Sequence, residues 1–319
     1  MEVKKLRNSL LLLLTATIWG VAFVFQSKGA DVMRPFTFNC LRFFIGGVSL
    51  LVLMSAQGMI KKKEPEPNKK PCKTLIAGGV LCGILMFVAT NFQQFGIEQT
   101  TVGKAGFITA FYIVLVPLLG IFLKKKCGIR AWISVAIALV GLYFLCIKDG
   151  FSIEIGDFLI LMCAFAFSVH ILVVDHYAPL CDGVHLSCIQ FFVCAILSGV
   201  CMLFFENDRM AQAFSALGGW DAWQALIVTG VFSCGVAYTL QIIGQKNMDP
   251  TIASLILSLE SVMSALAGWI FLGQSLLPKE MLGCVLMFCA IIMAQVSPKV
   301  IIDRFKEKTV KTAKRRIFK

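Results

Sequence analysis

The sequence predicts an all-α membrane protein of ten transmembrane helices, arranged as two inverted five-helix repeats. Hydrophobic residues make up 58% of the 319 residues and charged residues only 15%, whereas a soluble domain is usually about half apolar and a quarter charged. The apolar residues form stretches of about 20, which is the length of a helix that crosses a bilayer. Residues 148 positions apart also resemble each other along most of the chain.

The first apolar stretch, about residues 8–27, follows three basic residues as a signal peptide would. It is longer than the apolar region of a signal peptide and lacks an A-x-A cleavage site, so we interpret it as a retained first helix. The other predicted spans are about residues 35–57, 74–97, 101–123, 129–147, 155–175, 185–205, 222–246, 250–272 and 279–297. Three of these helices are expected to begin at a proline, where the missing N–H costs little: Pro35, Pro250 and Pro278.

The basic residues predict the orientation of these spans. Of the 30 Lys and Arg residues, 23 lie in the two tails and in the loops on the same face, and six lie on the opposite face. Because Lys and Arg concentrate on the cytoplasmic side, we expect both termini in the cytoplasm and the chain in the inner (cytoplasmic) membrane. Membrane topology explains the net charge of +12 better than nucleic-acid binding does. The basic tail, 298–319, either lies on anionic lipid or only enforces this topology.

The repeat predicts two domains, residues 1–148 and 149–297. Gln93 and Gly96 of the first half correspond to Gln241 and Gly244 of the second at the same offset and spacing. Five spans per repeat is an odd number, so the two halves must cross the membrane in opposite senses. Inverted repeats are common in secondary transporters, which expose a site at the membrane midplane to either side in turn. The alternative is an old duplication retained only for packing.

Glu260 is the sharpest candidate for a functional residue, because it lies in the middle of a predicted span. A charged acid there costs about 2.5–3.5 kcal/mol on insertion scales, so it must be protonated, paired or in contact with a wet cavity. It is either a substrate or proton site, or a structural acid that bonds a neighbouring helix. Tyr112 is its counterpart in the first repeat and offers a phenol and an aromatic face.

Arg42 lies about two turns into the second predicted span. It either anchors an anionic group of a solute or stabilises the fold by binding carbonyls. Further candidates for solute binding are polar or aromatic residues within the spans, which can hydrogen-bond and stack on a small molecule or join helices to each other. They are Trp19, Asn91, Gln93, Tyr238 and Gln241.

Several motifs characteristic of nucleotide, hydrolytic and metal sites are missing from the sequence. It contains no Walker A, G-x-G-x-x-G or G-x-S-x-G motif, so ATP coupling and common hydrolytic chemistry have no support. Three histidines between residues 170 and 185 have no metal-ligand spacing. The cysteines mostly lie within apolar stretches and behave as small hydrophobes. We therefore expect no cofactor, no metal, no disulfide framework and no enzyme.

A set of short motifs runs through the predicted first, second, fourth, ninth and tenth helices. They are Trp19-Gly20, Arg42, Lys104-Ala105-Gly106-Phe107-Ile108-Thr109, Tyr112, Val116-Pro117-Leu118, Leu259-Glu260, Ala267-Gly268-Trp269, Leu272-Gly273 and Gly283. This set resembles the ten-helix EamA-type exporters of the drug/metabolite transporter superfamily over about residues 8–297. In the family a proline often follows the acid of the ninth helix, where this chain has Ser261.

The resemblance implies a secondary transporter that exports small organic metabolites or drugs across the cell membrane, with proton coupling in some members. An importer or exchanger of solutes such as amino acids or nucleosides is an alternative within the same class. A membrane-embedded sensor or scaffold is an alternative from another class, and it would lack a central cavity. The expected partners are a small-molecule substrate and the lipid bilayer, and the oligomeric state stays open.

Overall fold

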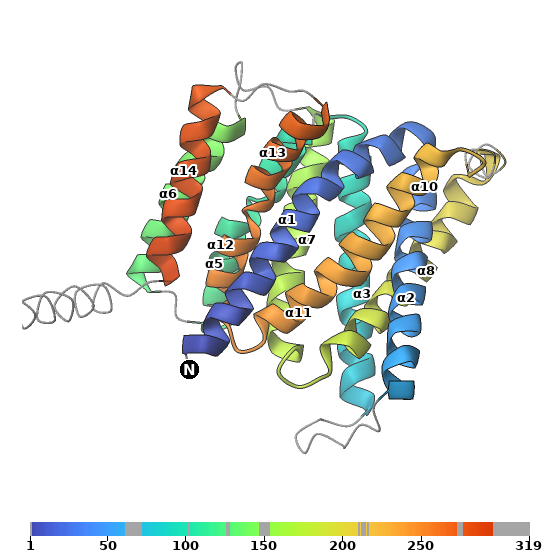
Figure 1. Cartoon of the computed structure of the whole chain (residues 1–319), viewed down its shortest axis with the longest axis horizontal. Helices are drawn as coiled ribbons and strands as arrows, with labels where there is room; N and C mark the ends of the chain where they lie inside the picture. The colour runs from blue at the N-terminus through green and yellow to red at the C-terminus, as the bar shows by residue number, and fades with distance from the viewer. Residues whose placement is uncertain are drawn as a thin grey trace, which may run out of the picture.

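The computed structural model shows the chain as a bundle of membrane-spanning helices (Figure 1). It describes residues 2–60, 72–100, 102–125, 128–146, 154–209, 211, 215, 217–272 and 277–295. Eight helices in this part of the chain are long and apolar enough to cross a bilayer, and Ile129–Phe144 is a shorter apolar helix. The described residues form no strand, and the predicted all-α membrane fold is confirmed. The basic tail at 298–319 lies outside the described residues.

Each repeat contributes five spans. Those of the first are α1 (Glu2–Val32), α2 (Pro35–Ile60), α3 (Cys72–Ile97), the pair α4 (Val102–Thr109) and α5 (Tyr112–Phe122), and α6 (Ile129–Cys146). Those of the second are α7 (Ile155–Tyr177), α8 (Gly183–Phe205), the run α10 (Trp220–Ile227), η2 (Val228–Tyr238) and α11 (Thr239–Gln245), the pair α12 (Pro250–Leu257) and α13 (Glu260–Leu272), and α14 (Pro278–Gln295). A short 3-10 turn, η1 (Asn207–Arg209), follows α8. The three predicted proline helix starts are confirmed.

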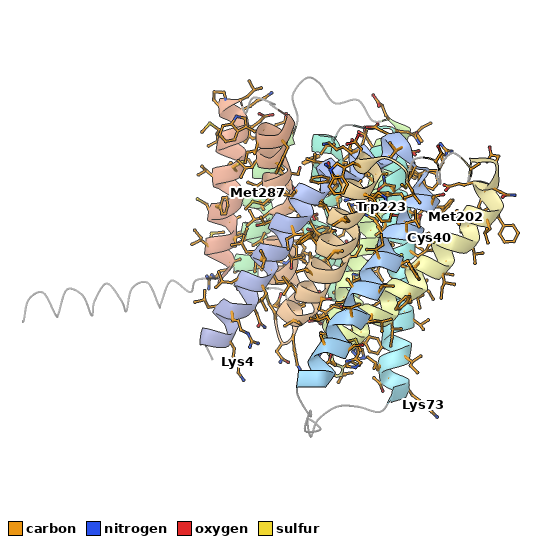
Figure 2. The ribbon with its side chains drawn as sticks, turned by 45° about the vertical axis from the view of Figure 1, so that its right-hand side comes forward. Lys4, Cys40, Lys73, Met202, Trp223 and Met287 are labelled. Carbon is orange, nitrogen blue, oxygen red and sulfur yellow. The ribbon has the colours of Figure 1, made fainter. Side chains whose placement is uncertain are left out.

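Helix starts recur at the predicted offset of 148 residues. The corresponding starts are Pro35 and Gly183, Cys72 and Trp220, Val102 and Pro250, and Tyr112 and Glu260. In Figure 1, α1 rises from the N-terminus at the lower end, whereas its counterpart α7 descends to the loop that leads into α8. The two repeats are therefore inverted. Lys4 and Lys73 lie at the lower end of the bundle and Trp223 at the upper end (Figure 2), in line with the predicted topology.

The helix contacts follow the same pseudo-symmetry. α2 packs on its own counterpart α8, and α6 packs on its own counterpart α14. Other contacts come in exchanged pairs: α3 packs on α7 as α11 packs on α1, and α5 packs on α7 as α13 packs on α1. The central core is shared by both halves and includes Phe43 and Phe191, whose ring centroids lie 6.0 Å apart. The two repeats therefore interlock across a common interface.

The fourth and ninth spans are each broken near the middle, which the sequence analysis did not predict. The breaks are the turns at Ala110 and Phe111 and at Ser258 and Leu259. Ser258 Oγ donates to the Leu255 carbonyl at 2.8 Å, within the break of the ninth span. Broken helices are tolerated at membrane depth where the backbone is covered by protein or lines a cavity, and secondary transporters often place binding sites there.

The eighth span contains an irregularity of a different kind. Its central part, η2, is a π-helix of 11 residues, whereas the corresponding part of α3 is α-helical. π-helical segments are rare and occur frequently at functional sites. A Cβ on Gly230 of η2 would lie 2.9 Å from the Arg42 carbonyl oxygen, so this segment packs directly on the backbone of α2.

Gly20, part of the Trp19-Gly20 motif, allows helices α1 and α13 to approach each other closely. A Cβ at this position would lie 2.4 Å from Met263 Cβ and 2.7 Å from the backbone nitrogen of Ser264. The backbones of α1 and α13 therefore touch, and α13 carries Glu260 at its first residue. Small residues permit such contacts between membrane helices.

We expect Gly20→Ala to destabilise the protein by about 1–3 kcal/mol, because the added methyl forces α1 away from α13. The measurement is the thermal unfolding midpoint in detergent. Unfolding is monitored by the increase in reactivity of the buried cysteines. Gly120→Ala is the matched control, since its Cβ would meet only Lys125 Cβ at 3.7 Å and alanine favours a helix. Equal midpoints for both variants would contradict the close contact at Gly20.

Candidate functional site

A pocket lies between the two repeats, near the middle of the bundle. Its cavity volume is about 20 Å³, room for little more than a water molecule, within about 430 Å³ of space between atoms that includes open solvent. Helices α1, α2, α3, α4 and α5 line it from the first repeat, and α7, η2, α11 and α13 from the second. Its lining residues are Trp19, Phe23, Gln26, Arg42, Gln93, Thr109, Tyr112, Phe167, Ile171, Ser233, Tyr238, Gln241 and Glu260.

Seven of the eight residues that the sequence analysis singled out line this pocket. They are Trp19, Arg42, Gln93, Tyr112, Tyr238, Gln241 and Glu260. They come from six different spans and from both repeats, as a solute site at the interface of two inverted repeats requires. That these residues bind solute stays a prediction.

Asn91 is the exception. Its side chain donates to the Phe87 carbonyl at 2.8 Å and to Ser198 Oγ at 3.3 Å, and its Oδ1 accepts from Asn39 Nδ2 at 2.8 Å. These bonds join α2, α3 and α8 away from the pocket lining. The position of Asn91 thus supports the helix-joining alternative for this residue.

Glu260 is placed by the break in the ninth span. It is the first residue of α13, and only 3% of its surface is exposed. Its Oε1 atom has no hydrogen-bond partner within the described part of the chain. Tyr112 occupies the matching position at the start of α5, and its phenol lies close enough to the carboxyl to interact with it. The two broken helices thus present an acid and a phenol to the same space.

Arg42 is held by its own repeat. Its Nη1 atom donates to Gln26 Oε1 at 2.9 Å, and its guanidinium lies over the rings of Phe43 and Phe38, at 4.9 Å and 5.5 Å from their centroids. Its Nε atom is buried and unbonded in the described structure. No ion pair joins Arg42 to Glu260 among the described residues, although both line the pocket.

Aromatic rings form one wall of the pocket. The rings of Trp19 and Tyr238 lie 4.6 Å apart, and the ring of Phe167 is stacked on Tyr238 at 6.5 Å. His170 meets the edge of Tyr238 at 6.4 Å and bonds Gln190 through Nε2 at 3.2 Å. This wall offers apolar surface, and the buried indole N–H of Trp19 has no partner in the described residues.

The sequence analysis missed six of the lining residues: Phe23, Gln26, Thr109, Phe167, Ile171 and Ser233. Gln26 is the most important, because it bonds Arg42 while its own carbonyl accepts from Gln94 Nε2 at 3.1 Å. An amide near the end of an apolar stretch was the available signal. Phenylalanines and isoleucines at the pocket have no such signal, since they look like any lipid-facing or core residue.

The described part of the chain contains no group of side chains that could bind a metal ion. No set of three or more His, Cys, Asp or Glu side chains there is arranged to hold an ion. The residues that line the pocket can therefore interact with a small molecule in two ways. It can hydrogen-bond and stack on a small molecule, and its acid and guanidinium can bind charged groups.

Known proteins resemble this chain along most of its length. It is 32% identical over 295 residues to an uncharacterized transporter of Archaeoglobus fulgidus, which covers 92% of this chain and 87% of that protein. It is 26% identical to the uncharacterized transporter YwfM of Bacillus subtilis, over 96% and 97% of the two chains. It is 23% identical to YoaV of the same organism, over 86% and 92%.

A protein of known crystal structure has the same fold as this chain. The two structures superpose with a TM-score of 0.69 over 90% of this chain and 96% of the other, and the sequences are 19% identical. The sequence also matches the EamA-like transporter family twice, over residues 7–147 and 154–295. These two matches cover nearly all of the helical bundle, and the chain therefore belongs to the EamA-like transporter family of drug/metabolite transporters.

Proposed function

We propose that this protein exports small organic solutes across the inner, cytoplasmic membrane by alternating access around the pocket. Both termini lie in the cytoplasm, and inward movement of protons drives the outward movement of solute. Residues 1–148 and 149–297 form the two bodies that rock against each other. The observation that carries this proposal is the pocket itself, which is lined by polar groups from both inverted repeats.

A sensor or scaffold fits the pocket less well. Such a protein needs a packed bundle, and buried polar atoms without partners weaken a packed bundle. Around the pocket, Trp19 Nε1, Arg42 Nε and Gln241 Oε1 all lack a hydrogen-bond partner in the described structure. A bound solute or water would satisfy these atoms, so their arrangement supports transport.

Glu260 is our candidate for the coupling residue. The titratable groups on which its charge acts are Tyr112 of α5, Cys163 of α7 and Tyr238 of η2, and Arg42 of α2 lines the same pocket. None of them forms an ion pair with Glu260 in the described structure. An unpaired acid next to a cavity can take up a proton from one side and release it to the other.

The function is tested with the purified protein in liposomes, by uptake and efflux of a metabolite library with and without a pH gradient. Accumulation of a solute on the side opposite to the termini, at the expense of the gradient, is the expected result. Accumulation on the terminal side would indicate an importer. Absence of transport for every solute would overturn the proposal.

We expect Glu260→Gln to retain solute exchange at equal pH but to lose transport driven by the pH gradient. Glutamine preserves the shape of a protonated acid but carries no exchangeable proton. The measurement is solute movement in liposomes under both conditions. Glu98→Gln is the control, because Glu98 faces Arg34 at 4.0 Å outside the pocket lining and should keep coupling. Full proton-driven transport by Glu260→Gln would assign coupling to another residue.

We expect a green fluorescent protein fused after Lys319 to be fluorescent, because the basic loops place both termini in the cytoplasm. Alkaline phosphatase at the same position should be inactive, since it needs the opposite compartment. The reverse pattern is expected for fusions after residue 209, in the connection from α8 to α10. Active phosphatase at the C-terminus would overturn the orientation.

A further inference from the structure

The pocket has to enlarge before a solute can enter it, because its cavity has room for little more than a water molecule. Its walls belong to both repeats, so the contacts that join the repeats at the ends of the bundle influence which end can open. Two charged side chains that join the repeats lie at opposite ends: Glu206, directly after α8, and Lys125, directly after α5 (Figure 1). Their surroundings give them different roles.

Glu206 completes the start of α2 and is part of the fold. Pro35 has no N–H, and the N–H groups of Phe36 and Thr37 donate to the carboxylate of Glu206 at 3.0 Å and 2.8 Å. Thr37 Oγ1 also donates to it at 2.7 Å, and Glu206 is only 3% exposed. Separation of α2 from α8 at this end would leave helix N–H groups and a buried carboxylate without partners, which is costly.

Lys125 joins the repeats by a contact that water can replace. Its Nζ atom donates to Asp175 Oδ2 near the end of α7, and the charge of Asp249, the N-cap of α12, also acts on it. The side chains of Lys125 and Asp175 are 36% and 13% exposed. Ion pairs with this access to water contribute little to stability, and water solvates both groups when they separate. This contact can therefore break and form again at little cost.

The backbone before Lys125 adopts an unusual conformation. Lys124 has a φ of 57°, in the left-handed region that residues with a side chain rarely adopt. Its N–H donates to the Ile121 carbonyl, and the N–H of Lys125 donates to the Gly120 carbonyl, both at 2.9 Å. This pattern ends a helix and usually has glycine at the left-handed position. Strained backbone is concentrated in switch and functional segments, and here it lies next to the ion pair.

The ion pair lies one helical turn beyond the pocket. Asp175 follows Ile171, which lines the pocket, by four residues, so the two side chains share one face of α7 about 6 Å apart along its axis. α5 runs from Tyr112 at the pocket to Lys125, and α12 runs from Asp249 to the break before Glu260. One short helix thus connects each break to the charged group at the end of the bundle that carries the N-terminus (Figure 1).

We propose that Lys125 and Asp175, together with Asp249, form a latch that closes the pocket toward the cytoplasm. When the ion pair separates, the cytoplasmic ends of α5 and α7 move apart and the pocket becomes accessible from that side. The contact at Glu206 stays intact and keeps α2 on α8. The latch residues are positioning residues, since they act through the helices that line the pocket. This inference rests on the proposed alternating access and adds the residues that control access from the cytoplasm.

The test labels a thiol in the pocket from one face of the membrane at a time. Thr109→Cys supplies the thiol, because Thr109 lines the pocket and is 1% exposed. The tryptic peptide that contains it, residues 105–124, has no native cysteine. The reagent is 2-(trimethylammonium)ethyl methanethiosulfonate, whose permanent charge keeps it from crossing membranes. It is applied to inside-out and to right-side-out vesicles of the full-length protein, and mass spectrometry of the peptide measures the labelling rate.

Lys125→Met removes the charge of the latch and keeps an unbranched side chain. We expect it to accelerate labelling from the cytoplasmic face about 2- to 10-fold, as the loss of one or two partly exposed ion pairs does, and to leave labelling from the other face no faster. Asp175→Asn should act in the same direction, and the double variant should match Lys125→Met, because both changes remove the same pair. Lys125→Arg keeps the charge and should label at the parent rate.

Two further variants serve as controls. Lys73→Met removes an exposed charge at the same end of the bundle (Figure 2) and should leave labelling unchanged. Glu206→Gln should lower the thermal unfolding midpoint, because an amide group replaces a carboxylate oxygen that accepts a bond, and it should not accelerate cytoplasmic labelling. Unchanged labelling in both Lys125→Met and Asp175→Asn, or an equal increase from both faces, overturns the proposal.

The outcome separates this inference from the proposed function, because labelling requires no solute. If the latch variants label like the parent while liposomes export a solute, the latch is wrong and the export function stands. If the latch variants label faster from the cytoplasmic face while liposomes transport no solute, the latch is confirmed and the export function is wrong.

Discussion

Backbone hydrogen bonding inside hydrocarbon is the constraint on which this structure depends. A bilayer offers no partner for a free N–H or C=O, so each span must be helical wherever it meets lipid. The chain departs from regular α-helix within its spans at the two breaks, Ala110–Phe111 and Ser258–Leu259, and in the π-helix η2. Residues next to all three departures line the pocket: Tyr112, Glu260 and Tyr238. The two breaks are covered by protein, since Ala110, Ser258 and Leu259 are buried, whereas η2 also carries exposed side chains at Phe232 and Val236.

The scaffold is symmetric, but the chemistry of the pocket is not. The matching breaks carry a phenol at Tyr112 and an acid at Glu260. Arg42 of α2 corresponds by the 148-residue offset to Gln190 of α8, which bonds His170 and does not line the pocket. The duplicated fold therefore provides two similar half-sites, and substitution within them gives each half a different charge. An asymmetric solute can be oriented by such a pair of half-sites.

Packing at the interface of the repeats determines how firmly these groups are positioned. Gly20 brings α1 into backbone contact with α13, and the residue that precedes it, Trp19, lines the pocket together with Glu260. Gly230 brings η2 against the carbonyl of Arg42. Both contacts allow no side chain between the helices. The lining of the pocket is thereby coupled to the helix interface along which alternating access would have to move.

The sequence by itself determined the membrane-spanning helices, the inverted repeat and the family, because each depends on hydrophobicity or spacing summed over many residues. It also indicated seven of the pocket residues, since polar or aromatic side chains within an apolar span stand out individually. The tertiary structure alone decided that Asn91 joins α2, α3 and α8, that Gln26 holds Arg42, and that the fourth and ninth spans are broken. These features depend on which faces of distant helices meet and on local backbone geometry. The sequence does not distinguish an amide side chain that bonds a neighbouring helix from one that faces a cavity.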